Sequence, residues 1–143
     1  MKFLVAYIST VAFSGMFNVP QTEFLFCGLG GSVCYIVNHM VVEKGHQEVT
    51  AAFFATIVLA FICRILAVYR KMPLTVFLVP GIFPIVPGSY IYFTAYYFIS
   101  GETINALQMG LETAKIAIGV ALGILLALAL PQSLFNNMIP RKG

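Results

Sequence analysis

Apolar residues fill long runs of this chain, and short polar segments separate the runs. The second and third runs are close to the roughly 20 residues that an α-helix needs to cross about 30 Å of hydrocarbon. The first part of the last run is polar ("TINALQMGLETAK"), so we expect its first turns at the membrane surface or against a partner. The sequence therefore predicts five hydrophobic segments, at residues 3–17, 24–42, 51–69, 74–99 and 103–130.

The composition supports lipid as the surrounding solvent. Hydrophobic residues make up 60% of the 143 residues and charged residues only 9%, with a mean hydropathy of +0.95. Soluble domains contain about 25% charged residues, so a soluble fold would lack side chains for its exterior. We predict an all-α, polytopic membrane helix bundle that forms a single integral membrane domain over residues 1–143. The opening "MKFLVAYISTVAFSG" is similar to a secretory signal, but the rest is equally apolar, so we expect a retained first span.

Charge and cysteine usage exclude several other classes. The net charge of +3 is small and scattered, which argues against a nucleic-acid partner. The three cysteines lie in apolar runs without a CxxC pair, and no histidine has metal-ligand spacing, so we expect packing roles and no metal or cofactor. The chain has no Asp, no phosphate-binding loop and no set of Ser, His and acid, and we predict that it is not an enzyme.

Basic residues near the segment ends give a weak prediction of orientation. If all five segments cross, one side carries two clustered pairs and the other side carries three separate lysines. Clustered Lys and Arg beside span ends are typical of the cytoplasmic side. We therefore favour an outside N-terminus and an inside C-terminus, with Arg70, Lys71, Arg141 and Lys142 inside and Lys2, Lys44 and Lys115 outside.

The fourth segment contains helix breakers at membrane depth, in "VPGIFPIVPGSYIYF" (residues 79–93). Each interior proline costs a helix about 3 kcal/mol, so the three prolines of this PGxxPxxPG motif should interrupt it. Residues before proline prefer extended backbone, here Val79, Phe83 and Val86. We predict a half-helix over residues 74–79, a non-helical stretch, and a second half-helix over residues 88–99.

A broken helix in a membrane is tolerated where it is buried in protein or lines a water-filled cavity. The N-terminus of a half-helix presents free N–H groups and a positive dipole end, which suits a carboxylate. We expect Ser89 and the N–H of Gly88 at that end. The alternative is a proline-kinked span that only shapes packing. The candidate substrate-binding residues are Pro80, Gly81, Pro84, Pro87, Gly88, Ser89, Tyr92 and Thr94.

Three polar residues are candidates for ion coupling, each with a structural alternative. Histidine as a residue type suits proton coupling, but His39 is also placed to be interfacial. Arg64 lies inside the third run, yet it is close enough to the run's end to snorkel. Glu102 suits a helix start. Small residues allow close approach of membrane helices, and we expect packing surfaces at Gly28, Gly30, Gly31, Gly119 and Gly123.

The central motif "PGIFPIVPGSYIY" resembles the proline-glycine signature of the threonine/serine exporter family, in its smaller C-terminal half. "MFNVP" at residues 16–20, "CGLGGS" at residues 27–32 and "ETAKIAIGVALG" at residues 112–123 add to the resemblance. It implies half of a secondary transporter of the bacterial inner membrane, acting with a larger subunit of about five spans or by self-association. Threonine and serine are the implied substrates, with a small dicarboxylate such as succinate as the alternative. A non-transporting docking or stabilising subunit is the rival function.

Overall fold

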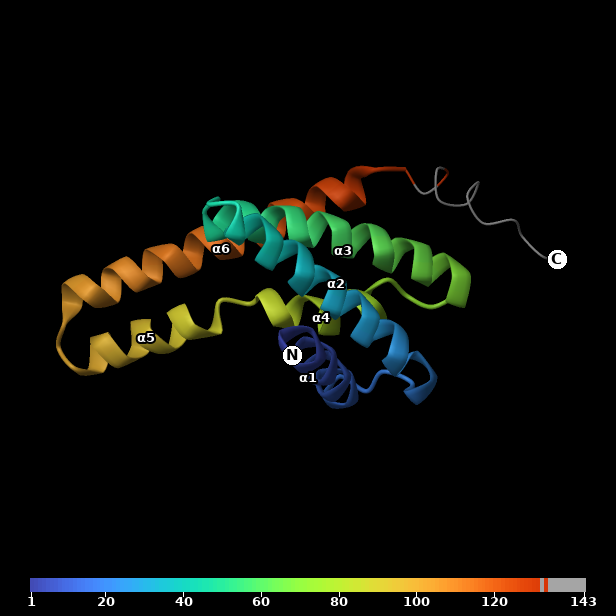
Figure 1. Ribbon diagram of the computed structural model, residues 1–143, viewed down its shortest axis with the longest axis horizontal. Helices are drawn as coiled ribbons and strands as arrows, with labels where there is room; N and C mark the ends of the chain where they lie inside the picture. Colours follow the sequence, from blue (N-terminus) through green and yellow to red (C-terminus); the bar gives the residue numbers. More distant parts are fainter. Residues whose placement is uncertain (132, 134–143) are drawn as a thin grey trace.

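The computed structural model describes residues 1–131 and 133, which form helices joined by short connections (Figure 1). The first runs become α1 (Lys2–Met16), a 3-10 helix η1 (Gln21–Glu23), α2 (Phe24–Glu43) and α3 (Glu48–Arg70). The fourth becomes α4 (Thr75–Ile82), a 3-10 helix η2 (Phe83–Ile85) and α5 (Gly88–Ile99), and the last becomes α6 (Thr103–Ala129). The predicted all-α class is confirmed for the described residues.

The helices divide between a bundle and a hairpin. α2 lies between α1 and α3 and runs antiparallel to each, and the short α4 packs against all three helices. α5 and the first half of α6 lie side by side and extend away from this bundle (Figure 1). The second half of α6 packs along α3, and the two helices run parallel. Gly119 contacts Val49, and Gly123, four residues later, contacts Phe53.

Glycines bring the helices close together. A Cβ built on Gly28 would lie 2.6 Å from the Tyr7 ring, and one on Gly31 would lie 2.2 Å from Oγ1 of Thr10. Such distances leave no room for a side chain, so α1 and α2 approach each other across these positions. The structure places Gly30 against Leu59 of α3, while Gly119 and Gly123 lie on the backbone of α3.

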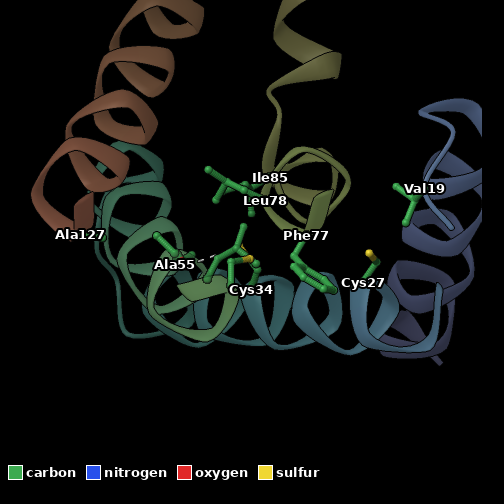
Figure 2. Close-up of a cluster of buried hydrophobic side chains, with 11 residues drawn as sticks. Val19, Cys27, Cys34, Ala55, Phe77, Leu78, Ile85 and Ala127 are labelled. Atoms are coloured by element: carbon green, nitrogen blue, oxygen red, sulfur yellow. Dashed lines mark hydrogen bonds between the residues drawn. The ribbon is translucent and has the colours of Figure 1, made fainter. Parts of the chain in front are cut away.

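The core of the bundle surrounds α4. Phe77 is 1% exposed and points toward α2, near Cys27 and Cys34 (Figure 2). The other members of this buried cluster are Val19, Ala55, Leu59, Ala60, Cys63, Leu78, Ile85 and Ala127. The three cysteines are buried and unoxidised, and they fill space between helices.

The break in the fourth segment begins later than predicted. α4 continues through Val79 and Pro80 to Ile82, and Phe83 keeps helical dihedrals, so the predicted end at residue 79 is wrong. Pro80 removes the donor for the carbonyl of Val76, and the Cys27 thiol donates to that carbonyl instead, at 3.5 Å. Burial of α4 in the core further offsets the cost of an interior proline.

After η2 the chain turns sharply. Val86 is extended, as predicted for a residue before proline, and Pro87 precedes the first residue of α5. The helices on the two sides of this point are bent by 57°. The second half-helix has the predicted bounds, Gly88–Ile99.

The protein is a multi-pass membrane protein, but five spans are not established. Three helical stretches of the described residues are long and apolar enough to cross, and the bent α4–α5 pair makes up to four. α1 has 15 residues, which gives about 22 Å at 1.5 Å per residue, less than the hydrocarbon thickness. Arg141 and Lys142 lie outside the described residues, so the orientation stays a prediction.

Candidate functional site

A cavity of about 620 Å³ lies where the proline-containing break meets the end of α2 and the start of α3. Its volume is in the range of small-molecule sites. α5 and α6 form the remaining walls. The lining residues are Tyr35, Asn38, His39, Val42, Glu48, Ala52, Pro84, Ile85, Val86, Pro87, Gly88, Ser89, Tyr90, Phe93, Tyr97, Met109 and Ile116.

The first turn of α5 forms one wall of this cavity. The first four N–H groups of a helix have no partner inside the helix. Here the N–H of Gly88 donates to the carbonyl of Val86 at 2.7 Å, and the N–H of Ile91 donates to Pro87 at 3.1 Å. The amides of Ser89 and Tyr90 therefore remain as the first-turn donors, whereas the N–H of Gly88 already has a partner within the turn. A ligand role for Gly88 stays a prediction.

His39 from α2 brings a titratable side chain to the cavity. Its Nε2 lies 3.3 Å from the Nζ of Lys2, and its Nδ1 lies 3.3 Å from Oε1 of Glu43. Lys2 itself lines a smaller neighbouring cavity that shares Tyr35 and Pro84 with the first one. The ammonium group of Lys2 therefore contacts His39 without lining the main cavity itself.

The predicted substrate-binding residues fall into two groups. Pro84, Pro87, Gly88 and Ser89 line the cavity, whereas the other four residues do not. Pro80 and Gly81 are buried in the bundle, where Gly81 packs on Leu59. Tyr92 is 63% exposed on the outer face of α5. The hydroxyl of Thr94 donates to the carbonyl of Tyr90 at 2.6 Å.

The coupling candidates are also separated by the fold. His39 alone of the three lies at the cavity. Arg64 does not snorkel, because it is 7% exposed and donates from Nη1 to the carbonyls of Ala127 and Leu130 at 2.6 Å. It thereby closes the C-terminal end of α6. Glu102 directly precedes α6 and accepts a hydrogen bond from the side chain of Asn105.

Two features were missed by the reasoning from sequence. Glu48 reaches the cavity from the first residue of α3, and only the meeting of distant elements reveals it. Glu23, which the sequence reasoning did not single out, has a side chain that is 4% exposed and forms an ion pair with Arg70. Nε of Arg70 donates to both carboxylate oxygens, at 3.0 and 2.9 Å. This pair joins α3 to η1 at the end of the bundle opposite to the cavity.

The comparisons with known proteins give one family. The family described as "Threonine/Serine exporter, ThrE" matches the chain over residues 2–130, which is nearly its whole length. Searches among curated proteins and among solved structures find no match.

Proposed function

The chain belongs to the threonine/serine exporter family, and we propose that its cavity at the proline-containing break is the solute site of a secondary exporter for small amino acids. Threonine and serine are the first candidates. The observation that carries this proposal is that residues 84–90 all line a cavity of about 620 Å³. They include Val86 and Pro87, the two residues that leave regular helix between η2 and α5. Within a membrane, non-helical backbone is tolerated where it is buried in protein or lines a water-filled cavity.

The arrangement suits recognition of a carboxylate. α5 begins at the cavity wall, and its 12 residues give it a positive N-terminal dipole end. The amides of Ser89 and Tyr90 are placed to bind a solute carboxylate, as half-helices do in many secondary transporters. The bend of 57° between α4 and α5 is the place where we expect movement during alternating access.

We further propose that a larger membrane subunit covers the hairpin. α5 has no buried residue, and its outer face carries exposed aromatic and aliphatic side chains. The first half of α6 continues this apolar surface with Ile104, Leu107 and Leu111, which are 76%, 64% and 53% exposed. The same surface would serve the rival function, in which the chain only docks to or stabilises another membrane protein.

Efflux separates the two functions. The chain would be expressed with and without its larger subunit in cells that accumulate threonine from a dipeptide, and the rate of threonine release would be measured. A Cβ built on Gly88 has no atom within 4 Å, so Gly88→Leu adds a side chain to open space without displacing the fold. We expect it to abolish most of the efflux.

The matched control is Ile8→Leu in α1, outside both the cavity and the hairpin surface, where Ile8 is 64% exposed. This variant should export threonine like the wild type. If threonine release is the same with and without the chain, and the same for Gly88→Leu and wild type, the exporter function is contradicted. The docking or stabilising function would then be the better explanation.

A further inference from the structure

We propose that Glu48 binds the ammonium group of the transported solute and rejects solutes with two negative charges. This inference rests on the proposed function, since it assigns a role within the same cavity. It concerns the choice between an amino acid and a dicarboxylate, both of which offer a carboxylate to α5.

The charges around the cavity are the first argument. Among the lining residues in the described part of the chain, Glu48 is the one carboxylate, and no Lys or Arg is present. His39 brings an imidazole to the lining, and its Nε2 lies 3.3 Å from the Nζ of Lys2. A dianion would face Glu48 with only His39, and Lys2 behind it, to balance two charges. A zwitterion brings its own cation to Glu48 and leaves a single carboxylate for the rest of the site.

The position of Glu48 is the second argument. α3 starts at Glu48 itself, so the carboxylate stands at the mouth of the cavity, where it is exposed. It lies close enough to Tyr90 of α5 to interact with that hydroxyl. Tyr90 follows Ser89, so Glu48 faces the same turn whose amides would hold the solute carboxylate. In an α-amino acid the ammonium and carboxylate groups share one carbon, so one molecule can reach both partners.

The partners of the other glutamates are the third argument. Each of them already has a polar or charged side chain beside it, in most cases at a position outside the cavity. Glu48 is the one glutamate of the described residues that lines the cavity, and its neighbour Tyr90 lines the cavity as well. The other pairs are Glu23 with Arg70, Glu43 with His39, Glu102 with Asn105 and Glu112 with Lys115.

A purely structural role for Glu48 makes a different prediction. An acidic residue in the first turn stabilises a helix through its dipole. Loss of that effect would change the amount or stability of the protein, and it would lower the transport of all solutes alike. A change in the preference between solutes therefore distinguishes recognition from stabilisation.

The experiment compares threonine with a solute that lacks only the ammonium group and with a dicarboxylate. Membrane vesicles would be prepared from cells that express the full chain with its larger subunit. Counterflow of labelled threonine, 3-hydroxybutyrate and succinate would be measured for wild type, Glu48→Gln and Glu48→Asp. Here 3-hydroxybutyrate stands for threonine without its amino group. Glu112→Gln is the matched control, since Glu112 is 44% exposed, pairs with Lys115 and does not line the cavity.

We expect wild type and Glu112→Gln to prefer threonine strongly over both other solutes. In Glu48→Gln the ratio of threonine to 3-hydroxybutyrate transport should fall roughly 10- to 100-fold, as for loss of a hydrogen bond to a charged group. Glu48→Asp keeps the charge and should retain most of the preference.

An unchanged ratio in Glu48→Gln, including an equal loss of both solutes, would overturn the role of Glu48. That result leaves the proposed function standing as long as the wild type transports threonine. Absence of threonine counterflow in the wild type with its larger subunit would instead contradict the proposed function itself.

Discussion

At the scale of single residues, the unusual feature is a proline inside a buried helix. Pro80 has no N–H for the carbonyl of Val76, and an unpaired buried carbonyl is costly in the absence of water. The thiol of Cys27 from α2 supplies the missing donor at 3.5 Å. Cys27 thus has a specific partner, whereas the Cys63 thiol makes no hydrogen bond within the described residues. In the core, Cys27 acts as a hydrogen-bond donor, whereas Cys63 contributes only packing.

This difference leads to a prediction about stability. Cys27→Ala should lower the free energy of unfolding in detergent by about 1–2 kcal/mol more than Cys63→Ala, because it also leaves the Val76 carbonyl unpaired. Cys27→Ser keeps a donor and should recover part of that loss. Thermal unfolding of the three purified variants measures the effect. Equal midpoints for the two alanine variants would show that the thiol does not stabilise the carbonyl.

At the scale of elements, the contact between α3 and α6 depends on two glycines. A Cβ on Gly119 would lie 2.9 Å from the carbonyl oxygen of Val49, and one on Gly123 would lie 2.8 Å from that of Phe53. These neighbours are backbone atoms, which cannot move aside as the end of a side chain can. α6 forms one wall of the cavity, so its distance from α3 also sets the shape of the site.

We therefore expect Gly123→Ala to lower the free energy of unfolding by about 1–3 kcal/mol, the usual cost of overpacking. The control is Gly15→Ala in α1, where the added Cβ would lie 3.9 Å from the nearest atom, the Cζ of Phe24. That change should be neutral or slightly stabilising, because alanine is the better helix former. Chemical unfolding in micelles compares the two variants. A similar stability for both would contradict the close contact of α6 with α3.

The helices themselves were largely predictable, because a hydrophobic run bounded by polar residues leaves little choice. The run at residues 24–42 became α2 (Phe24–Glu43), and the second half-helix kept its predicted bounds. The continuation of α4 through Pro80 was not predictable. The hydrogen bond that Pro80 cannot donate is supplied by the thiol of Cys27, 53 residues earlier in the sequence, and no local pattern indicates this contact. Local rules describe the cost of a proline, whereas tertiary contacts decide whether the helix continues.

At the scale of the whole molecule, the cavity exists because distant segments meet at one end of the bundle. The loop between α2 and α3 brings Glu48 and His39 to the proline-containing break, and the hairpin of α5 and α6 closes the far wall. The opposite end is held by the ion pair of Glu23 and Arg70. The sequence indicated the break, and four of the eight predicted substrate-binding residues line the cavity, but the acidic residue at its mouth required the fold.

This arrangement implies a site that is open from one side only. The cavity lies at the end of the bundle where α3 begins, while the buried cluster around Phe77 fills the middle (Figure 2). A solute should therefore reach Ser89 from that end, and a bound solute should shield it. The native cysteines are buried and should stay silent toward an aqueous thiol reagent.

The most direct test of the central claim is the labelling of Ser89→Cys with a membrane-impermeant maleimide in vesicles that contain the larger subunit. We predict labelling of this position that slows as threonine is added, while His46→Cys, in the exposed loop between α2 and α3 and outside the cavity lining, shows no protection. Labelling of Ser89→Cys at a rate that threonine does not change, or no labelling from either side, would contradict a solute cavity at the proline-containing break.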